Sequence, residues 1–421
     1  MKKIKNFRWW IVGLLAIVTA VNYFDRQNFP LVYAEIKNTI PISDAQYGLL
    51  SSLFLLAYGT MYAVGGRIVD ILGSKIGYAI IVVWWSLANM LNGLVSSVMG
   101  LGISRFLLGM GEGGGFPASA KVVSEWFPKK ERSYAFGIFN TGSSIGAIIA
   151  PILIYFIVDS TGSWRWTFII FGMVGLLWVI AWMKMFHVPG KSQYVTEEEK
   201  QYIAAEQSLE ETAGNTDIPW VKLLQYRKLW GLLVMKFLTD AAWFFFLFWL
   251  PKYLNDIRGL DIQGIGAYAW IPYAFAATGS FVGGWLSSFL IKKHLSLDMS
   301  RKIALGISAM LLPASLLITS SSSVLFAIFF FGIAMMGHQF WSTIVQTLAV
   351  DMFPSKVVGS VSGLMGCIGT YGAMIFSLII GFVIQNQGYA PAFIVSGLLH
   401  PLSFVLLFLI IRKIEPVTVN C

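Results

Sequence analysis

The sequence predicts an all-α integral membrane protein, with twelve transmembrane helices in two pseudo-symmetric six-helix halves around a central cavity. Three observations predict this fold class. Of the 421 residues, 57% are hydrophobic and only 12% are charged, which is too little charge to cover a soluble protein of this length. The apolar residues form twelve long runs. Residues of the first six runs recur in the last six at a nearly constant offset.

Each run is long enough to cross a bilayer, which requires about 20 mostly apolar residues. The runs are continuous rather than alternating, which argues against a membrane β-barrel. The first run resembles a signal peptide, but its length and the eleven later runs favour an uncleaved helix. The twelve runs cover residues 9–29, 47–68, 76–95, 101–123, 135–158, 166–186, 229–254, 267–291, 303–318, 324–350, 361–384 and 393–411.

The positions of lysine and arginine predict the orientation. If the N-terminus is placed inside and the runs alternate, the inner segments hold 23 of these residues and the outer connections four. Positive charge concentrates on the cytoplasmic side, so we expect both termini in the cytoplasm. The net charge of +9 is then a topology signal, and we expect the lipid bilayer rather than nucleic acid as its partner.

Residues 189–222 are expected to be a cytoplasmic linker between an N-terminal half, 1–188, and a C-terminal half, 223–421. This stretch is rich in acidic residues. Residues 196–211 could form a surface helix, with Thr196 as the N-cap and Glu199 closing a capping box. A solvated linker is the simpler interpretation, and a regulatory segment is the alternative.

The internal repeat joins the second, fourth and fifth runs to the eighth, tenth and eleventh. Ordered matches across three helix pairs are not expected by chance, even in a glycine-rich chain. Two halves of the same orientation predict a cavity between them, near the middle of the bilayer. At an offset of 226 the matches are Gly111 with Gly337, Glu125 with Asp351, Phe127 with Phe353, Pro128 with Pro354, Gly137 with Gly363 and Gly146 with Gly372.

Charged residues inside the runs are the candidates for function, because each would cost about 2.5–3.5 kcal/mol or more on a lone helix facing lipid. They should therefore face the cavity or pair with one another. A buried carboxylate beside an arginine can change protonation as the cavity opens to one side, which proton coupling requires. Structural pairing is the alternative, and it is the simpler interpretation of the last two. The six are Asp25, Arg26, Arg105, Glu112, Lys236 and Asp240.

His338 falls on Glu112 in the repeat and therefore occupies the equivalent site of the second half. With its neighbours on the same run it could bind sugar hydroxyls, although hydrogen bonding between helices is the alternative. His400 lies on the last run, where packing is the expected role. Those neighbours of His338 are Gln339, Trp341 and Ser342.

The segment 109–114 has the sequence GMGEGG, which formally fits the dinucleotide pattern GxGxxG. It lies inside an apolar run and follows no strand, so the context of that motif is missing. Small residues at this spacing instead allow close approach of helices. Pro117 and Pro151 are expected to kink their helices. We find no phosphate-binding lysine motif and expect no ATP-driven pump.

The loop after the second run, Gly66-Arg-Ile-Val-Asp70-Ile-Leu-Gly73-Ser-Lys75, resembles the signature loop of the major facilitator superfamily. The resemblance extends over nearly the whole chain. The loop departs from the signature at Ile71 and Ser74, where basic residues are usual.

Two further motifs are similar to the anion:cation symporter branch of that superfamily, Asn22-Tyr-Phe-Asp25-Arg26 and Arg105-Phe-Leu-Leu-Gly-Met-Gly-Glu112. The segments 237–240, 248–251, 337–342 and 351–354 resemble bacterial hexuronate transporters. The resemblance implies proton-coupled uptake of an anionic sugar such as glucuronate or galacturonate. It implies a carrier rather than an enzyme, functional as a monomer, with the proton as coupling ion and no cofactor or metal.

The resemblance also implies roles for individual residues. Asp25 and Glu112 would carry protons, Arg105 would partner Glu112, and Arg26 would bind the substrate carboxylate. The remaining candidates would line the substrate site. These are Tyr23, Tyr58, Asn140, Ser143, Trp243, His338, Gln339, Trp341 and Ser342.

Other functions stay open at this point. A carrier of another organic anion, such as an aldonate or aldarate, is the nearest alternative. A receptor or channel is a more distant one. A membrane enzyme would need a convergent set of catalytic side chains, and the sequence shows none beyond the charged residues inside the runs.

Overall fold

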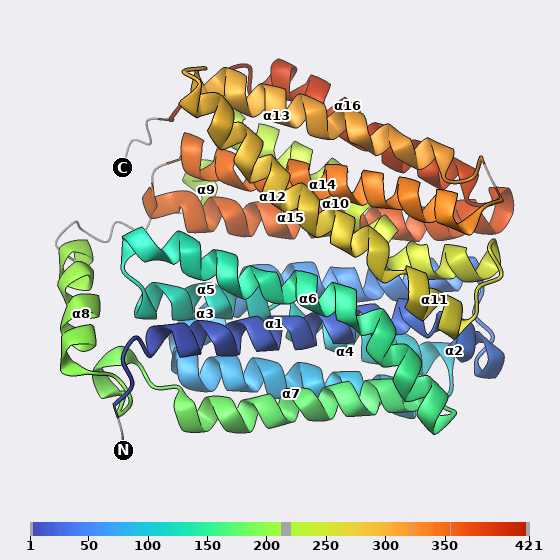
Figure 1. Cartoon of the computed structure of the whole chain (residues 1–421), viewed down its shortest axis with the longest axis horizontal. Coiled ribbons are helices and arrows are strands. Elements are labelled where there is room, and N and C mark those ends of the chain that lie inside the picture. The colour runs from blue at the N-terminus through green and yellow to red at the C-terminus, as the bar shows by residue number, and fades with distance from the viewer. Residues whose placement is uncertain (1–2, 212–219, 321, 354, 418–421) are drawn as a thin grey trace.

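The computed structural model describes residues 3–211, 220–320, 322–353 and 355–417. In this part of the chain the regular structure is helical, apart from one isolated bridge between Ile4 and Val195. Figure 1 shows two layers of helices lying side by side, one from each half of the chain. The predicted fold class is confirmed.

The N-terminal layer contains the first six predicted crossings. The second and third are the two arms of α3, which are separated by non-helical backbone at Gly73, where φ is 75° and the chain reverses direction. Glycine adopts positive φ without steric cost, so the turn needs no loop. The elements are α1 (Arg8–Leu31), α2 (Tyr33–Thr39), α3 (Asp44–Leu94), α4 (Val98–Glu112), α5 (Gly115–Trp126), α6 (Lys129–Thr161) and α7 (Arg165–Met185).

The C-terminal layer repeats this plan. Its helices correspond to the last six predicted runs, with ends that shift by a few residues. The elements are α10 (Arg227–Asp256), α11 (Ile262–Tyr268), α12 (Trp270–Lys292), α13 (Leu297–Leu311), the 3-10 segment η2 (Leu312–Leu317), α14 (Val324–Met352), α15 (Ser355–Gln387) and α16 (Ala390–Ile410).

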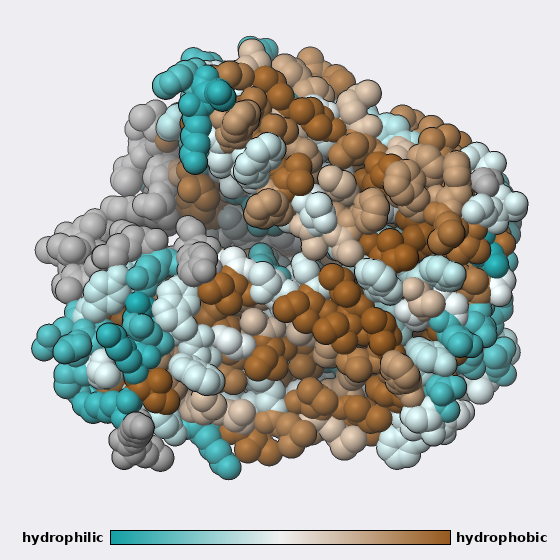
Figure 2. Space-filling view, in the orientation of Figure 1, coloured by the Kyte–Doolittle hydropathy of each residue, from teal (hydrophilic) through white to brown (hydrophobic). Residues whose placement is uncertain are grey.

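Within the described residues, nine helical stretches are long and apolar enough to span a membrane. The 51 residues of α3 exceed twice the about 20 residues that one crossing requires, so its two arms on either side of Gly73 account for two crossings. The other two predicted crossings are α1 and the pair α4–α5. Figure 2 shows the matching surface, a broad hydrophobic band with hydrophilic residues toward both ends of the helices.

The two ends of the bundle differ, and we name them by what lies there. The terminal face carries both chain ends and α8 (Glu197–Glu211), and the distal face carries α2 and the start of α3 (Figure 1). The linker also contains η1 (Pro189–Lys191) and α9 (Trp220–Leu223).

Helix α8 is docked at its start. The Thr196 hydroxyl accepts the Glu199 amide at 3.3 Å, which confirms the predicted N-cap. The Glu199 carboxylate does not serve a capping box, because it accepts hydrogen bonds from the Phe7 amide at 3.0 Å and from Arg8 at 2.8 Å. The start of this segment is therefore attached to the N-terminal half through Glu199, while its neighbours Glu197 and Glu198 are exposed.

The internal repeat is visible in the packing. A Cβ at Gly146 of α6 would lie 2.7 Å from the Ala20 carbonyl oxygen of α1, and a Cβ at Gly372 of α15 would collide with the Phe237 carbonyl of α10. Gly146 and Gly372 differ by 226 residues, and Ala20 and Phe237 differ by 217. The same close helix contact thus occurs once in each half.

At the terminal face, side chains of the signature loop within α3 contact side chains of α5. Lys121 pairs with Asp70 at 3.0 Å, and the Ser74 hydroxyl donates to Glu125 at 2.7 Å. In the second half, Arg301 donates to Asp351 at 2.8 Å in the equivalent place. Ser74 and Arg301 thus contact the repeat-equivalent acidic residues Glu125 and Asp351.

The halves meet along α3 and α15. Gly48 and Gly381 face each other there, and a Cβ on Gly48 would lie 2.9 Å from the Gly381 Cα. The polar contacts between the halves that involve described side chains lie from the distal face to mid-helix. They are Asp44–Lys252, Ala45–Gln385, Tyr47–Phe248, Ser52–Met374 and Thr60–Tyr371. The distal face is therefore closed.

Candidate functional site

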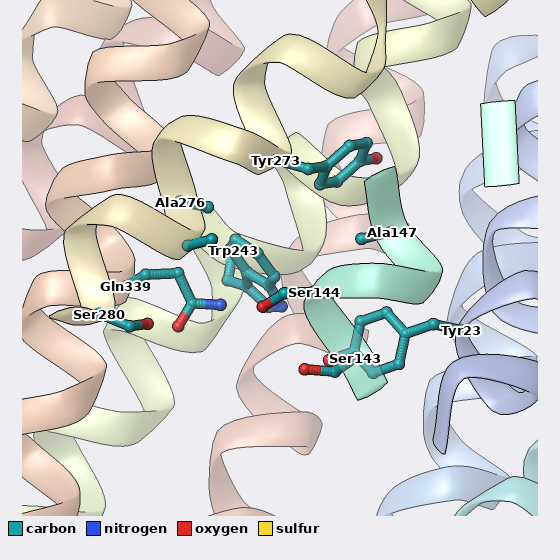
Figure 3. A pocket seen from close by; sticks show the side chains of 10 residues that line it. Tyr23, Ser143, Ser144, Ala147, Trp243, Tyr273, Ala276, Ser280 and Gln339 are labelled. Carbon is teal, nitrogen blue, oxygen red and sulfur yellow. The ribbon is translucent and has the colours of Figure 1, made fainter. Parts of the chain in front are cut away.

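A cavity with about 290 Å³ of empty space lies between the two halves. The N-terminal half contributes side chains from α1 and α6, and the C-terminal half contributes α10, α12 and α14 (Figure 3). That space includes open solvent, and the room for a water-sized molecule amounts to about 20 Å³. This is enough for about one water, so a monosaccharide requires the halves to move apart. The lining residues are Tyr23, Ser143, Ser144, Ala147, Trp243, Tyr273, Ala276, Ala277, Ser280 and Gln339.

Four predicted substrate-site residues meet in this cavity, namely Tyr23, Ser143, Trp243 and Gln339. Asn140 lies one helical turn from Ser143, exposed, and its carbonyl accepts the Ser143 hydroxyl at 2.6 Å. The cavity therefore has hydroxyl, amide and aromatic groups on opposite walls. This is the donor and acceptor set that a polyhydroxylated ligand needs.

The wall formed by α12 was missed from the sequence. Its residues are small or aromatic and carry no charge, so no chemical signal marked Tyr273, Ala277 or Ser280. The internal repeat gave the one indication in the sequence that α12 contributes to the cavity. The offset of 218 that joins α3 to α12 places Tyr58 on Ala276, which lines the cavity.

Beside the cavity, Arg26 and Glu112 form a buried ion pair. The Arg26 Nε donates to Glu112 Oε2 at 3.1 Å, and the two side chains are 5% and 0% exposed. The second carboxylate oxygen of Glu112 makes no hydrogen bond with a described residue. Glu112 is the last residue of α4, so the helix break that follows places this carboxylate between α1 and α4.

Arg26 is held from several directions. Its Nη2 donates to the Asn22 amide oxygen at 2.9 Å. The guanidinium carbon lies 4.9 Å from the ring centre of Tyr23 and 4.6 Å from that of Tyr58. Tyr23 lines the cavity, so Arg26 lies directly behind the cavity wall. Tyr58 therefore contacts Arg26 rather than the cavity itself.

Asp25 points away from Arg26, as adjacent helical residues must. Its carboxylate accepts the Asn89 side-chain amide at 2.6 Å, inside the N-terminal half between α1 and α3. The side chain is fully buried, and its other oxygen has no partner among the described residues. Asp25 is thus a second buried carboxyl group near the Arg26–Glu112 pair.

Arg105 does not form the expected contact with Glu112. Its guanidinium is fully buried between the rings of Phe29, at 4.9 Å, and Phe54, at 4.5 Å. None of its three nitrogens makes a hydrogen bond with a described residue. Arg26 binds the Glu112 carboxylate instead, and seven residues of helix separate Arg105 from Glu112 by about 10 Å along the axis.

Lys236 and Asp240 form the ion pair that their spacing predicts, at 2.7 Å. Asp240 packs against Gly369 of α15, where a Cβ would clash with its carboxylate. The pair therefore contributes to the contact between α10 and α15. The expected pairing of these two residues is therefore present, and its structural role stays a prediction.

The prediction that the face of His338 lines the cavity is wrong. A helix turns about 100° per residue, so His338, Trp341 and Ser342 share one face of α14 and Gln339 lies on another. The first face points into the C-terminal half, where Trp341 is 1% exposed and Ser342 accepts from Gln346 at 3.4 Å. Only Gln339 reaches the cavity.

His338 instead contacts two aromatic neighbours. Its ring stacks on Trp243 with centroids 5.0 Å apart and planes at 14°. Its Nδ1 lies 3.1 Å from Nε2 of His400. His400 is fully buried, so the packing role expected for it includes a hydrogen bond to His338.

The glycine motif at 109–114 serves helix packing, as predicted. A Cβ at Gly109 would collide with the Phe54 carbonyl, and one at Gly113 with the Tyr58 carbonyl. A Cβ at Gly114 would lie 3.0 Å from the Ile81 side chain. The same glycines separate α4 from α5, so the predicted helix distortion lies just before Pro117 rather than at it.

The distal side of the cavity is closed by a buried lysine, Lys252 of α10. It pairs with Asp44 of the opposite half at 2.7 Å and with Asp256 of its own helix. Tyr389 donates to the same Asp256 carboxylate at 2.9 Å. Burial raises the pKa of Tyr389 well above its usual value, and Asp256 raises it further. Its hydroxyl therefore stays protonated at neutral pH and can donate.

Among the described residues, no group of three or more His, Cys, Asp or Glu side chains could hold a metal ion. The polar groups of the site are instead ion pairs, amides and hydroxyls. The geometry is that of a ligand-binding cavity with two buried carboxylates beside it.

Comparison with known proteins agrees with this geometry. Residues 15–370 match the family described as the Major Facilitator Superfamily. The chain is 31% identical to the hexuronate transporter of Escherichia coli (strain K12) over 415 residues, covering 98% of this chain and 96% of that protein. It is 34% identical to the galacturonate transporter of Dickeya chrysanthemi over 316 residues, covering 74% and 91%.

A solved structure shares the same fold. It is a bacterial homolog of the human lysosomal transporter Spinster in an inward-facing, unoccupied conformation. The two match with a TM-score of 0.75 at 18% identity, over 97% of this chain and 98% of that one.

Proposed function

The chain belongs to the major facilitator superfamily and is therefore a membrane transporter rather than an enzyme, and from this premise we propose that it imports a sugar acid together with protons. The substrate is a hexuronate such as glucuronate or galacturonate. The two similar transporters named above carry molecules of this class, and the cavity between the halves is lined by hydroxyl, amide and aromatic side chains.

The observation that carries this proposal is the buried ion pair between Arg26 and Glu112 behind the cavity wall. An arginine fork binds carboxylates well, so a substrate carboxylate and Glu112 compete for Arg26. Protonation of Glu112 frees Arg26 for the substrate. Because an unpaired buried charge is costly, the proton and the anion bind together or leave together. Asp25 offers a second buried carboxyl group for the same coupling.

Transport proceeds by alternating access between the halves. The contacts that close the distal face support a cavity entered from the terminal face. The bias of positive charge to the terminal face supports a cytoplasmic location for it. The protein then lies in a bacterial inner membrane as a multi-pass carrier and acts as a monomer.

A second candidate function is transport of an open-chain sugar acid, an aldonate or aldarate. The observation that favours it is that Arg26 recognises a carboxylate whatever the rest of the molecule. The cavity hydroxyls of Ser143, Ser144 and Ser280 would serve either substrate.

The test is uptake into proteoliposomes of a panel containing glucuronate, galacturonate, galactonate, glucarate and neutral galactose, with and without a pH gradient. The expected result is accumulation of a hexuronate against its gradient when the outside is acidic. Equal uptake with and without the pH gradient would contradict proton coupling. Uptake of no acid in the panel would reject sugar-acid transport.

A further inference from the structure

Trp243 is the largest side chain of the cavity wall, and one face of its indole is already covered. His338 stacks on that face at 5.0 Å with nearly parallel planes. Trp243 nevertheless lines the cavity (Figure 3). The indole therefore borders the cavity with a part of its surface that His338 leaves uncovered.

The stack is fixed by three helices. Trp243 lies on α10, His338 on α14 and His400 on α16. The hydrogen bond between the two imidazoles sets the rotation of the His338 ring. Trp341 packs edge-on against His400, with centroids 5.4 Å apart and planes at 75°. Neither histidine lines the cavity, so both act on it through the tryptophan.

The internal repeat shows what this stack replaces. The offset of 217 that matches α1 to α10 places Arg26 on Trp243, and the offset of 226 places Glu112 on His338. An ion pair in one half thus occupies the position of an aromatic stack in the other. The cavity has a carboxylate-binding side and a flat apolar side.

A hexuronate in its ring form matches this asymmetry. Its carboxylate projects from one end of the pyranose ring, and one face of the ring presents C–H groups that pack on an aromatic face. An aldonate or aldarate has the carboxylate but, as an open chain, has no such rigid face. Ala276 and Ala277 are small residues of the same cavity wall, so they would limit a ring beside the indole least once the halves move apart.

We propose that Trp243 is the platform on which the pyranose ring stacks, and that His338 and His400 are positioning residues that hold the indole for it. The platform makes the carrier prefer cyclic hexuronates over open-chain sugar acids. This inference rests on the proposed function, since it concerns the substrate class of the same cavity.

The first test changes His400, which positions the indole, and leaves Trp243 itself unchanged. His400→Phe keeps an aromatic ring against Trp341 but removes the hydrogen bond to His338. We expect the KM for galacturonate to rise about tenfold, equivalent to about 1.4 kcal/mol, with an unchanged maximal rate and an unchanged KM for galactonate. His400→Gln places an amide near the position of Nε2 and should restore the KM.

Ser403→Ala is the matched control. Ser403 is buried on the same helix, three residues further on, and makes no hydrogen bond with a described residue. This change should leave both KM values unaltered. An equal KM increase in His400→Phe and Ser403→Ala, or an equal increase for galacturonate and galactonate, would mean that His400 has a structural role only.

The second test keeps the proposal falsifiable if His400→Phe does not fold. Trp243→Leu removes the platform directly, and the preference for galacturonate over galactonate should disappear. A preference that survives in Trp243→Leu would overturn the inference while leaving the proposed transport intact. Wild-type uptake of galactonate without any hexuronate would also overturn it. Wild-type uptake of neither class would instead reject the proposed function.

Discussion

Lys252, on α10 of the C-terminal half, contacts Asp44 at the start of α3 in the N-terminal half over 2.7 Å, with its own side chain fully buried. The ring of Tyr33 lies 4.7 Å from its ammonium, and those of Tyr47, Trp249 and Tyr389 lie 5.9 Å away. Aromatic faces attract a cation, more strongly when water is excluded. This lysine therefore joins the halves at the distal face.

The first prediction follows from this contact. Lys252→Met leaves Asp44 and Asp256 without their shared cation, which weakens the closed distal face. If the closed distal face loses about 1.4 kcal/mol of stability, the equilibrium shifts about tenfold toward the conformation in which this face is open. With Cys367 and Cys421 replaced by serine, a cysteine at Ser52 reports the opening. We expect an impermeant thiol reagent applied to intact cells to label it several-fold faster in Lys252→Met.

Lys37→Met is the control for this experiment. Lys37 is an exposed lysine of α2 on the same face, and its removal should leave the labelling rate unchanged. Equal labelling of the Lys252→Met and wild-type proteins would show that the lysine does not hold the distal face closed.

Glu112→Gln tests proton coupling. A neutral amide imitates a permanently protonated carboxyl group, so Arg26 is always free for the substrate anion. Accumulation driven by a pH gradient should be abolished, while exchange of labelled for unlabelled hexuronate continues. The control is Glu35→Gln, which changes an acidic residue of α2 at the distal face. This variant should accumulate the hexuronate normally. Undiminished proton-driven accumulation in Glu112→Gln would remove Glu112 from the coupling mechanism.

Arg26→Gln tests recognition of the carboxylate. Loss of one partner of a buried charge pair costs about 2–5 kcal/mol, so affinity for galacturonate should fall at least about 30-fold. Weak binding of neutral galactose should change little. Ligand-induced shifts in thermal unfolding measure both affinities. A parallel loss for the acid and for the neutral sugar would indicate a folding defect instead.

Gly146→Ala tests the close contact between α1 and α6. The new Cβ would lie 2.7 Å from the Ala20 carbonyl oxygen and 2.8 Å from the Tyr23 Cβ. Overpacking of this kind costs about 1–3 kcal/mol, and it displaces a residue of the cavity wall. Both the melting temperature in detergent and the uptake rate should fall.

Gly137→Ala is the matched change on the same helix, where a Cβ would meet nothing within 4 Å. Alanine is favoured over glycine in a helix by up to about 1 kcal/mol, so this variant should be as stable as the wild type or more so. If both alanine variants behave alike, the close approach at Gly146 does not limit stability.

Much of the fold was predictable because the membrane imposes it. Continuous apolar runs and the lysine and arginine bias depend on length and composition, which the sequence displays directly. The internal repeat also indicated which helices of the two halves correspond and that a cavity lies between the halves. The reversal of α3 at Gly73 and the break between α4 and α5 were harder to predict, because a glycine adopts many backbone conformations and only its neighbours select one.

The site was predictable to the level of residue type but not of partner. Arg26, Arg105 and Glu112 stood out because charges inside a membrane are costly. Which arginine binds Glu112 depends on contacts between α1 and α4, and spacing along one helix does not reveal them. The same limit applied to α14, where a rotation of one residue separates Gln339 in the cavity from His338 behind Trp243.

The contact of Gly48 with Gly381 has a consequence for the speed of the transport cycle. Where helices of two moving bodies interlock through long side chains, each cycle must move those side chains between rotamers. At Gly48 and Gly381, α3 and α15 touch backbone to backbone, so at this point they can shift against each other without a rotamer change. A methyl group on either glycine would clash with the backbone of the facing helix. Such a clash would hinder the motion between the halves and slow every transport cycle.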